Sequence, residues 1–169
     1  MNNEEIVLKS LLKHEPQHIR ELARSTKLHP NTITTTISKL EKRKLVSIEK
    51  AEKTLIRYSD NKLAKNRKVM YAIEEIIGSD LLEFLDDRYT YPTVILFGSV
   101  QKGEAHKDSD IDICIISTEK KECDLKKFEK KLGRTIHCLL HTKTEFRKIS
   151  EELRINILNG ITLSGYCEF

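Results

Sequence analysis

The sequence lacks any long apolar run, and no stretch approaches the roughly 18 residues that a membrane-spanning helix requires. Its first residues, MNNEEIVLKS, also lack the basic and then apolar pattern of a secretory signal. We therefore expect a soluble, cytoplasmic protein. The four cysteines include no CxxC pair, and Cys114 and Cys138 lie in strand-like runs. This favours reduced thiols that serve as small hydrophobic side chains.

Charge is distributed unevenly along the 169 residues. Residues 1–70 carry 16 Lys and Arg against 8 Asp and Glu, and residues 71–169 carry 14 against 18, which together give the net charge of +4. A basic half attracts nucleic acid through its phosphates, whereas an acidic half is suited to holding cations. The chain is long enough for two small domains, and the charge distribution suggests a different partner for each.

Three helices are predicted in the basic half. Apolar residues recur at helical spacing before Pro16, again from Ile19 to Leu28, and again from Pro30 to Leu45. The second and third helices, joined by a tight turn, form a helix-turn-helix. Its outward face is small, polar and basic, as a major groove requires, and consists of Asn31, Thr32, Thr34, Thr35, Ser38, Lys39 and Lys42.

A hairpin follows, with strands predicted in LVSIEK and TLIRYSD and with Lys50, Lys53 and Arg57 on it. The segment IRELARSTKLHPNTITTTISKLEKRKLV resembles winged-helix regulators of the MarR and ArsR type. The resemblance implies DNA binding by the polar helix face together with Lys53 of the wing. It also leaves open a domain that docks on another protein. From Asp60 onward the chain is predicted to be helical with one break at Gly78-Ser79, where Ser79 and Asp80 can cap a second helix. We place the winged-helix domain at residues 1–58, a basic helical connector at 59–75 and a second domain at 76–169.

Two short strands flank a polar loop in the second domain. TVILF is a continuous apolar run, and it is followed by Gly98 and Ser99 and then by the strand DIDICIIS. Asp110 and Asp112 share one face of that strand, about 7 Å apart, with isoleucines on the other, which is the face that we expect to be buried. Two carboxylates so placed repel each other unless a cation lies between them, so we expect Mg²⁺, with Mn²⁺ as the alternative. Gly98 permits an unusual backbone conformation, and Ser99 can donate to a phosphate.

The full stretch FGSVQKGEAHKDSDIDICI resembles the nucleotidyltransferase superfamily that includes DNA polymerase beta, kanamycin nucleotidyltransferase and the minimal nucleotidyltransferases. The resemblance implies an α/β (α+β) domain with a mixed sheet flanked by helices. It further implies a nucleoside triphosphate bound by Gly98, Ser99 and Ser109, and catalytic Asp110 and Asp112 that hold the metal. Minimal nucleotidyltransferases are often paired with HEPN-domain proteins, so such a partner is also an expectation.

This family usually has a third carboxylate on a later strand. That strand is here GRTIHCLLHT, between the predicted helices LKKFEKKLG and KTEFRKISEELRINIL, and it contains no Asp or Glu. His137, or alternatively Thr135, takes the facing position, and Glu104 is a further acidic residue near the site. A neutral histidine can serve as ligand or base, or it can indicate lost catalysis.

Two hypotheses for the function follow. The chain transfers a nucleoside monophosphate to a hydroxyl, or it is a DNA-binding regulator or antitoxin whose nucleotidyltransferase fold binds nucleotide or partner with little turnover. A homodimer is compatible with both.

Overall fold

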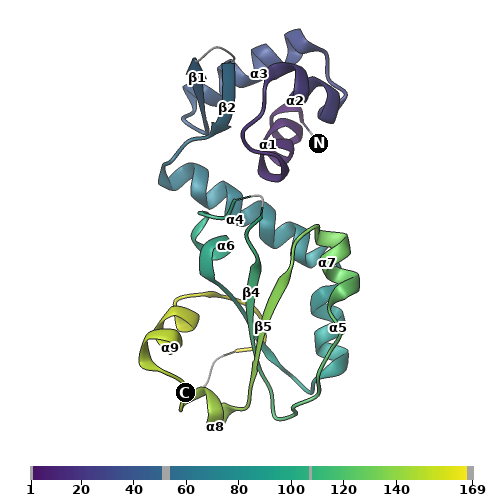
Figure 1. The fold of residues 1–169 in the computed structure, drawn as a ribbon, viewed down its shortest axis with the longest axis vertical. Coiled ribbons are helices and arrows are strands. Elements are labelled where there is room, and N and C mark those ends of the chain that lie inside the picture. Colours follow the sequence, from purple (N-terminus) through teal and green to yellow (C-terminus); the bar gives the residue numbers. More distant parts are fainter. Residues whose placement is uncertain (1, 51–53, 107, 167–169) are drawn as a thin grey trace. The chain divides into compact units, whose positions relative to one another are not determined.

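The computed structural model describes residues 2–50, 54–106 and 108–166. The chain divides into two compact units, Met1–Lys68 and Val69–Phe169. Each unit has its own helices and strands (Figure 1). Each also has its own set of buried apolar side chains. In the part of the chain that the structure describes, every helix is too short or too polar to cross a membrane.

In the described residues of the first unit, three helices are followed by a two-stranded antiparallel sheet, as the sequence predicts, and then by the start of a longer helix. Its elements are α1 (Asn3–Lys13), α2 (Ile19–Thr26), α3 (Pro30–Lys42), β1 (Val46–Lys50) and β2 (Thr54–Tyr58). Asn2 and Glu5 form a capping box at the start of α1, and Pro30 occupies the first turn of α3. Apolar side chains from all three helices and from β2 are fully buried, so the elements share one core.

Helix α4 (Lys62–Ile77) ends at the predicted break, and α5 (Leu81–Arg88) begins after it. The expectation that both Ser79 and Asp80 cap α5 is wrong for Asp80. The Ser79 hydroxyl accepts a hydrogen bond from the Leu81 backbone N–H at 3.2 Å, whereas Asp80 makes no side-chain cap bond. Asp80 adopts a left-handed φ of 65°, and its carboxylate instead pairs with Lys131 at 2.7 Å.

The second unit is built on a mixed four-stranded sheet with the order β5-β4-β3-β6. Its strands are β3 (Thr93–Phe97), β4 (Ile111–Ile116), β5 (Ile136–His141) and β6 (Ile161–Ser164). Strand β3 is antiparallel to both of its neighbours, and β4 is parallel to β5. Helices connect and flank the strands, so the mixed sheet flanked by helices is confirmed. Besides α4 and α5 they are α6 (Gly98–Lys102), α7 (Lys126–Leu132), α8 (Lys143–Phe146) and α9 (Glu151–Leu158).

Both faces of this sheet are covered, which corrects the expectation that β4 has only one buried face. Ile111, Ile113 and Ile115 belong to the larger apolar cluster, with side chains of α4, α5 and α7. Cys114 and Ile116, which share the face of Asp112, are buried in a second cluster with side chains of α8 and α9. The start of β4, which carries Asp112, therefore lies beyond the part of this face that α8 and α9 cover.

Two segments of the second unit differ from expectation. The polar stretch after Phe97 begins with the short helix α6 and is not a loop throughout, and residues 143–158 form two helices where one is expected. Ser150 separates the two because its hydroxyl accepts from the Leu153 backbone N–H at 3.4 Å and starts α9. The small-hydrophobe interpretation fits Cys138, because burial raises the pKa of its thiol to about 12 and so keeps it neutral.

Candidate functional site

The site begins at the bend that follows β3. Gly98 has φ 75°, a left-handed conformation that favours glycine, and Ser99 follows in the first turn of α6. In the β3–β4 register Phe97 lies opposite Asp112. A methyl group on Gly98 would fall 2.9 Å from Cγ of Asp112 and still closer to one of its carboxylate oxygens. The Asp112 carboxylate thus lies directly against the glycine bend.

His137 is the neighbour of Asp112 on the other side. The parallel register pairs the two residues, and Nδ1 of His137 lies 3.1 Å from Oδ1 of Asp112. The histidine side chain is 60% exposed and the aspartate 25%, so the pair lies at the surface of the sheet. On β5, Ile136 and Cys138 point into the larger core. The facing position on this strand is therefore held by His137, as the sequence predicts.

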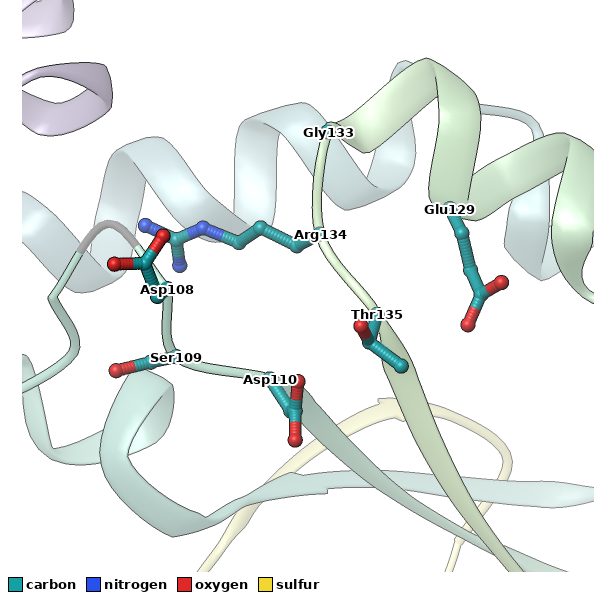
Figure 2. Close-up of a pocket in the computed structure, with 7 residues that line it drawn as sticks. All are labelled: Asp108, Ser109, Asp110, Glu129, Gly133, Arg134 and Thr135. Carbon is teal, nitrogen blue, oxygen red and sulfur yellow. The ribbon is translucent and has the colours of Figure 1, made fainter.

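Asp110 lies just before β4 and lines an open cavity of about 440 Å³ (Figure 2). The backbone N–H of Ile111 donates to the carbonyl of Thr135. This bond holds the start of β4 beside the start of β5. Ser109 lies in the same wall, where its hydroxyl accepts from the His106 backbone N–H at 2.9 Å. The cavity is lined by Asp108, Ser109, Asp110, Glu129, Gly133, Arg134 and Thr135.

The two other candidates for a third polar group lie in different places. Thr135 lines the cavity with Asp110 and precedes His137 by two residues, so both side chains belong to the same edge. Glu104 is exposed in the loop after α6, and its backbone N–H donates to the carbonyl of Ser99. This backbone bond ties the loop to the glycine-serine bend.

The side chains at this edge fit a metal ion that arrives with a substrate. Among the residues that the structure describes, no three His, Cys, Asp or Glu side chains are grouped so as to hold an ion by themselves. Mg²⁺, however, is commonly held by one or two carboxylates together with substrate phosphates and water. Asp110 and Asp112 supply two carboxylates of this kind.

Arg134, a cation that lines the cavity, was not predicted from the sequence. Arg134 lies in the loop between α7 and β5 and extends across the cavity toward the stretch that carries Asp108 (Figure 2). Glu129, on α7, is also unforeseen, and its carboxylate accepts from the Ile136 backbone N–H at 2.9 Å. No motif marks either residue. The signal that the sequence did contain is their position before the strand that begins with Ile136 and His137.

In the first unit, the predicted polar face of α3 is largely exposed. Exposed side chains are Asn31, Thr34, Thr35, Ser38, Lys39 and Lys42, and Thr32 is half-buried. The hydroxyls of Thr34 and Thr35 donate to backbone carbonyls one turn earlier, each at 3.0 Å. The two lysines are thus the charged groups that this set presents. Lys53 lies outside the described residues.

Comparison with known proteins addresses the second unit. No curated protein matches the chain. The family model of the nucleotidyltransferase domain matches residues 79–163, about half of the chain. This range starts before α5 and ends within β6, so it contains the glycine-serine bend, both aspartates and His137. The chain therefore belongs to the nucleotidyltransferase domain family.

Proposed function

We propose that the chain transfers a nucleoside monophosphate from a nucleoside triphosphate to a hydroxyl group. The observation that carries this proposal is the contact of Asp112 with the Gly98 bend. It brings a carboxylate suited to a metal ion next to a bend suited to phosphates. In this assignment Gly98, Ser99 and Ser109 bind the triphosphate.

Asp110 and Asp112 would hold Mg²⁺, which neutralises phosphate charge and polarises the phosphoryl group. In the reaction, the acceptor oxygen forms a bond to the α-phosphorus, and the bond from that phosphorus to the bridging oxygen breaks. Pyrophosphate leaves with the electron pair of the broken bond. Ser99 orients the phosphate chain by donating to it, which positions the α-phosphorus for attack.

His137 is placed to receive the proton of the acceptor hydroxyl. When Nδ1 donates to the Asp112 carboxylate, Nε2 carries the lone pair and can accept a proton. Within the described residues no hydrogen bond engages Nε2. A histidine can in this way stand in the place of a third carboxylate.

The experiment that tests the proposal uses nucleoside triphosphates labelled at the α-phosphate, Mg²⁺ and candidate acceptors. We expect label transfer by the native chain and none by the Asp110→Ala/Asp112→Ala double variant. Both side chains lie at the surface edge of the sheet, so the variant should fold, which circular dichroism checks. Transfer that is equal in both proteins contradicts the proposal.

A second function is favoured by one observation, which is the histidine on β5 where the family has an acid. In this alternative the chain is a regulator or antitoxin whose nucleotidyltransferase domain binds nucleotide or a partner with little catalysis. The same experiment separates the two. Metal-dependent nucleotide binding that the double variant loses, without transfer to any acceptor, supports the alternative.

For the first unit we propose a winged helix that binds DNA through α3, supported by the surplus of basic residues and the exposed polar face. We expect the affinity for duplex DNA to fall steeply as salt rises, because bound counterions are released. Lys39→Ala/Lys42→Ala should lower the slope of log K against log salt by about 2. Lys13→Ala, outside that face, is the matched control. Affinity that does not depend on salt would indicate a protein-docking domain instead.

A further inference from the structure

The cavity beside Asp110 has Ser109 and Asp110, which belong to the proposed donor site, on one side, and Arg134 and Thr135, which do not, on the other. In the strand order β5-β4-β3-β6, the Gly98 bend follows β3 and so lies on one side of the aspartates. Arg134 and Thr135 precede β5 and lie on the other side. If the triphosphate occupies the bend, this second flank remains for the acceptor.

Arg134 is the one cation among the residues that line this cavity. Its side chain is half-buried, and in the described part of the chain its guanidinium makes no hydrogen bond or ion pair. Burial lowers the pKa of this guanidinium, and the negative charge of Glu75 acts in the opposite direction. A half-desolvated arginine without a hydrogen-bonding partner presents its planar fork of N–H donors to a ligand, and that fork matches the oxygens of a phosphate or carboxylate.

The backbone holds this side chain in place. The N–H of Arg134 donates to the carbonyl of Glu129 at 3.2 Å, and the preceding Gly133 closes α7 with a left-handed φ of 68°. The arginine therefore starts from a fixed point at the end of a helix, and Figure 2 shows it reaching over the cavity.

Three carboxylates share the cavity with Arg134, and they decide when an anion can enter. Glu129 is engaged by the Ile136 backbone N–H, and Asp108 is exposed to solvent. Asp110 is the carboxylate assigned to the metal. An incoming anion is repelled while Asp110 is uncompensated, and Mg²⁺ held by Asp110 would offset the charge of this carboxylate.

We propose that Arg134 binds an oxyanion of the acceptor, so that the hydroxyl that receives the nucleotide belongs to a molecule with a phosphate or a carboxylate close by. This inference rests on the proposed nucleotidyl transfer and adds the class of acceptor to it. Arg134 is a binding residue for that acceptor, and the donor triphosphate does not need it.

The test measures anion binding to the donor-loaded protein. The chain is saturated with Mg²⁺ and each of the four α,β-methylene nucleoside triphosphates in turn, which bind but cannot transfer. Inorganic phosphate and, in a separate arm, acetate are then titrated while the arginine side-chain N–H signals are followed by NMR. We expect saturable binding of at least one anion that perturbs the Arg134 signal. The anion with the higher affinity shows whether the acceptor carries a phosphate or a carboxylate.

Arg134→Gln should weaken this binding about tenfold or more, because a charge-assisted pair is lost. Arg134→Lys should retain part of the affinity, since the charge remains without the fork. Lys130→Gln is the matched control because it removes one exposed positive charge of α7 that does not line the cavity, and it should leave the affinity unchanged. Asp108→Asn should bind the anion as well as the native chain or more tightly.

Three results overturn the inference and leave the proposed function intact. They are equal anion affinity in Arg134→Gln, no anion binding to the loaded chain, and competition between the anion and the nucleotide analogue for one site. Failure of the native chain to bind any of the analogues with Mg²⁺ contradicts the proposed function itself. Circular dichroism confirms that each variant is folded before it is compared.

Discussion

Asp112→Asn is expected to abolish most nucleotidyl transfer while leaving the fold intact. The substitution keeps the size of the side chain and a polar atom within reach of His137, which lies 3.1 Å away. It removes the negative charge that would hold Mg²⁺ against the Gly98 bend. A metal ion contributes several kcal/mol of charge stabilisation in phosphoryl transfer, so we expect the rate to fall by about 10²- to 10³-fold.

Single-turnover transfer of a labelled nucleotide measures this effect, and denaturant unfolding of the same variant provides the control. The unfolding midpoint should change little, because a partly exposed carboxylate contributes little to stability once its shape is retained. Ser164→Ala, which removes a hydroxyl that bonds Asp86 away from the site, is a comparison variant that should retain full activity. Native transfer rates in Asp112→Asn would show that this carboxylate is not part of the chemistry.

Gly98→Ala is expected to lower transfer by about 10²-fold or more, because it displaces Asp112. The new methyl group would lie 2.9 Å from Cγ and 3.2 Å from Cβ of Asp112, so the aspartate has to turn away from the bend. Misplacement of a reacting group by about 1 Å is enough for a loss of this size. Alanine also takes up the left-handed φ of 75° at a cost of about 1–2 kcal/mol.

Gly133→Ala serves as a comparison that separates the backbone strain of a left-handed alanine from the displacement of Asp112. Gly133 has a similar φ of 68°, but nothing lies within 4 Å of its added methyl group. Denaturant unfolding should show the strain cost alone in Gly133→Ala and a larger loss of unfolding free energy in Gly98→Ala. If the two variants lose equal stability and Gly98→Ala keeps its activity, the contact between bend and aspartate has no role.

Local patterns were sufficient to predict that the Gly98 bend and the acidic start of β4 lie together. Gly98 and Ser99 end an apolar strand, and Asp110 and Asp112 begin the next, so their arrangement depends on strand alternation and on one sharp bend. These are properties of short segments. The position of His137 followed in the same way, because the apolar residues on either side of it fix which face it takes.

Features that depend on contacts between distant segments were not predicted. Side chains of α8 and α9, which follow β5 in the chain, pack over Cys114 and Ile116. No pattern within β4 predicts this packing. Arg134 belongs to no motif, and only the parallel pairing of β4 with β5 brings it to the cavity of Asp110. The error at Asp80 has a local cause, since the Ser79 hydroxyl makes the bond that a capping aspartate would have made.

The pairing of β6 with β3 links the last strand of the described chain to the glycine-serine bend. Residues 161–164 run along the strand whose last residue, Phe97, immediately precedes Gly98. Gly160 lies so close to the Leu96 carbonyl that no larger residue fits without movement. A protease cut or a fused tag in this terminal strand should therefore impair catalysis before it unfolds the protein, although neither would touch a residue of the site.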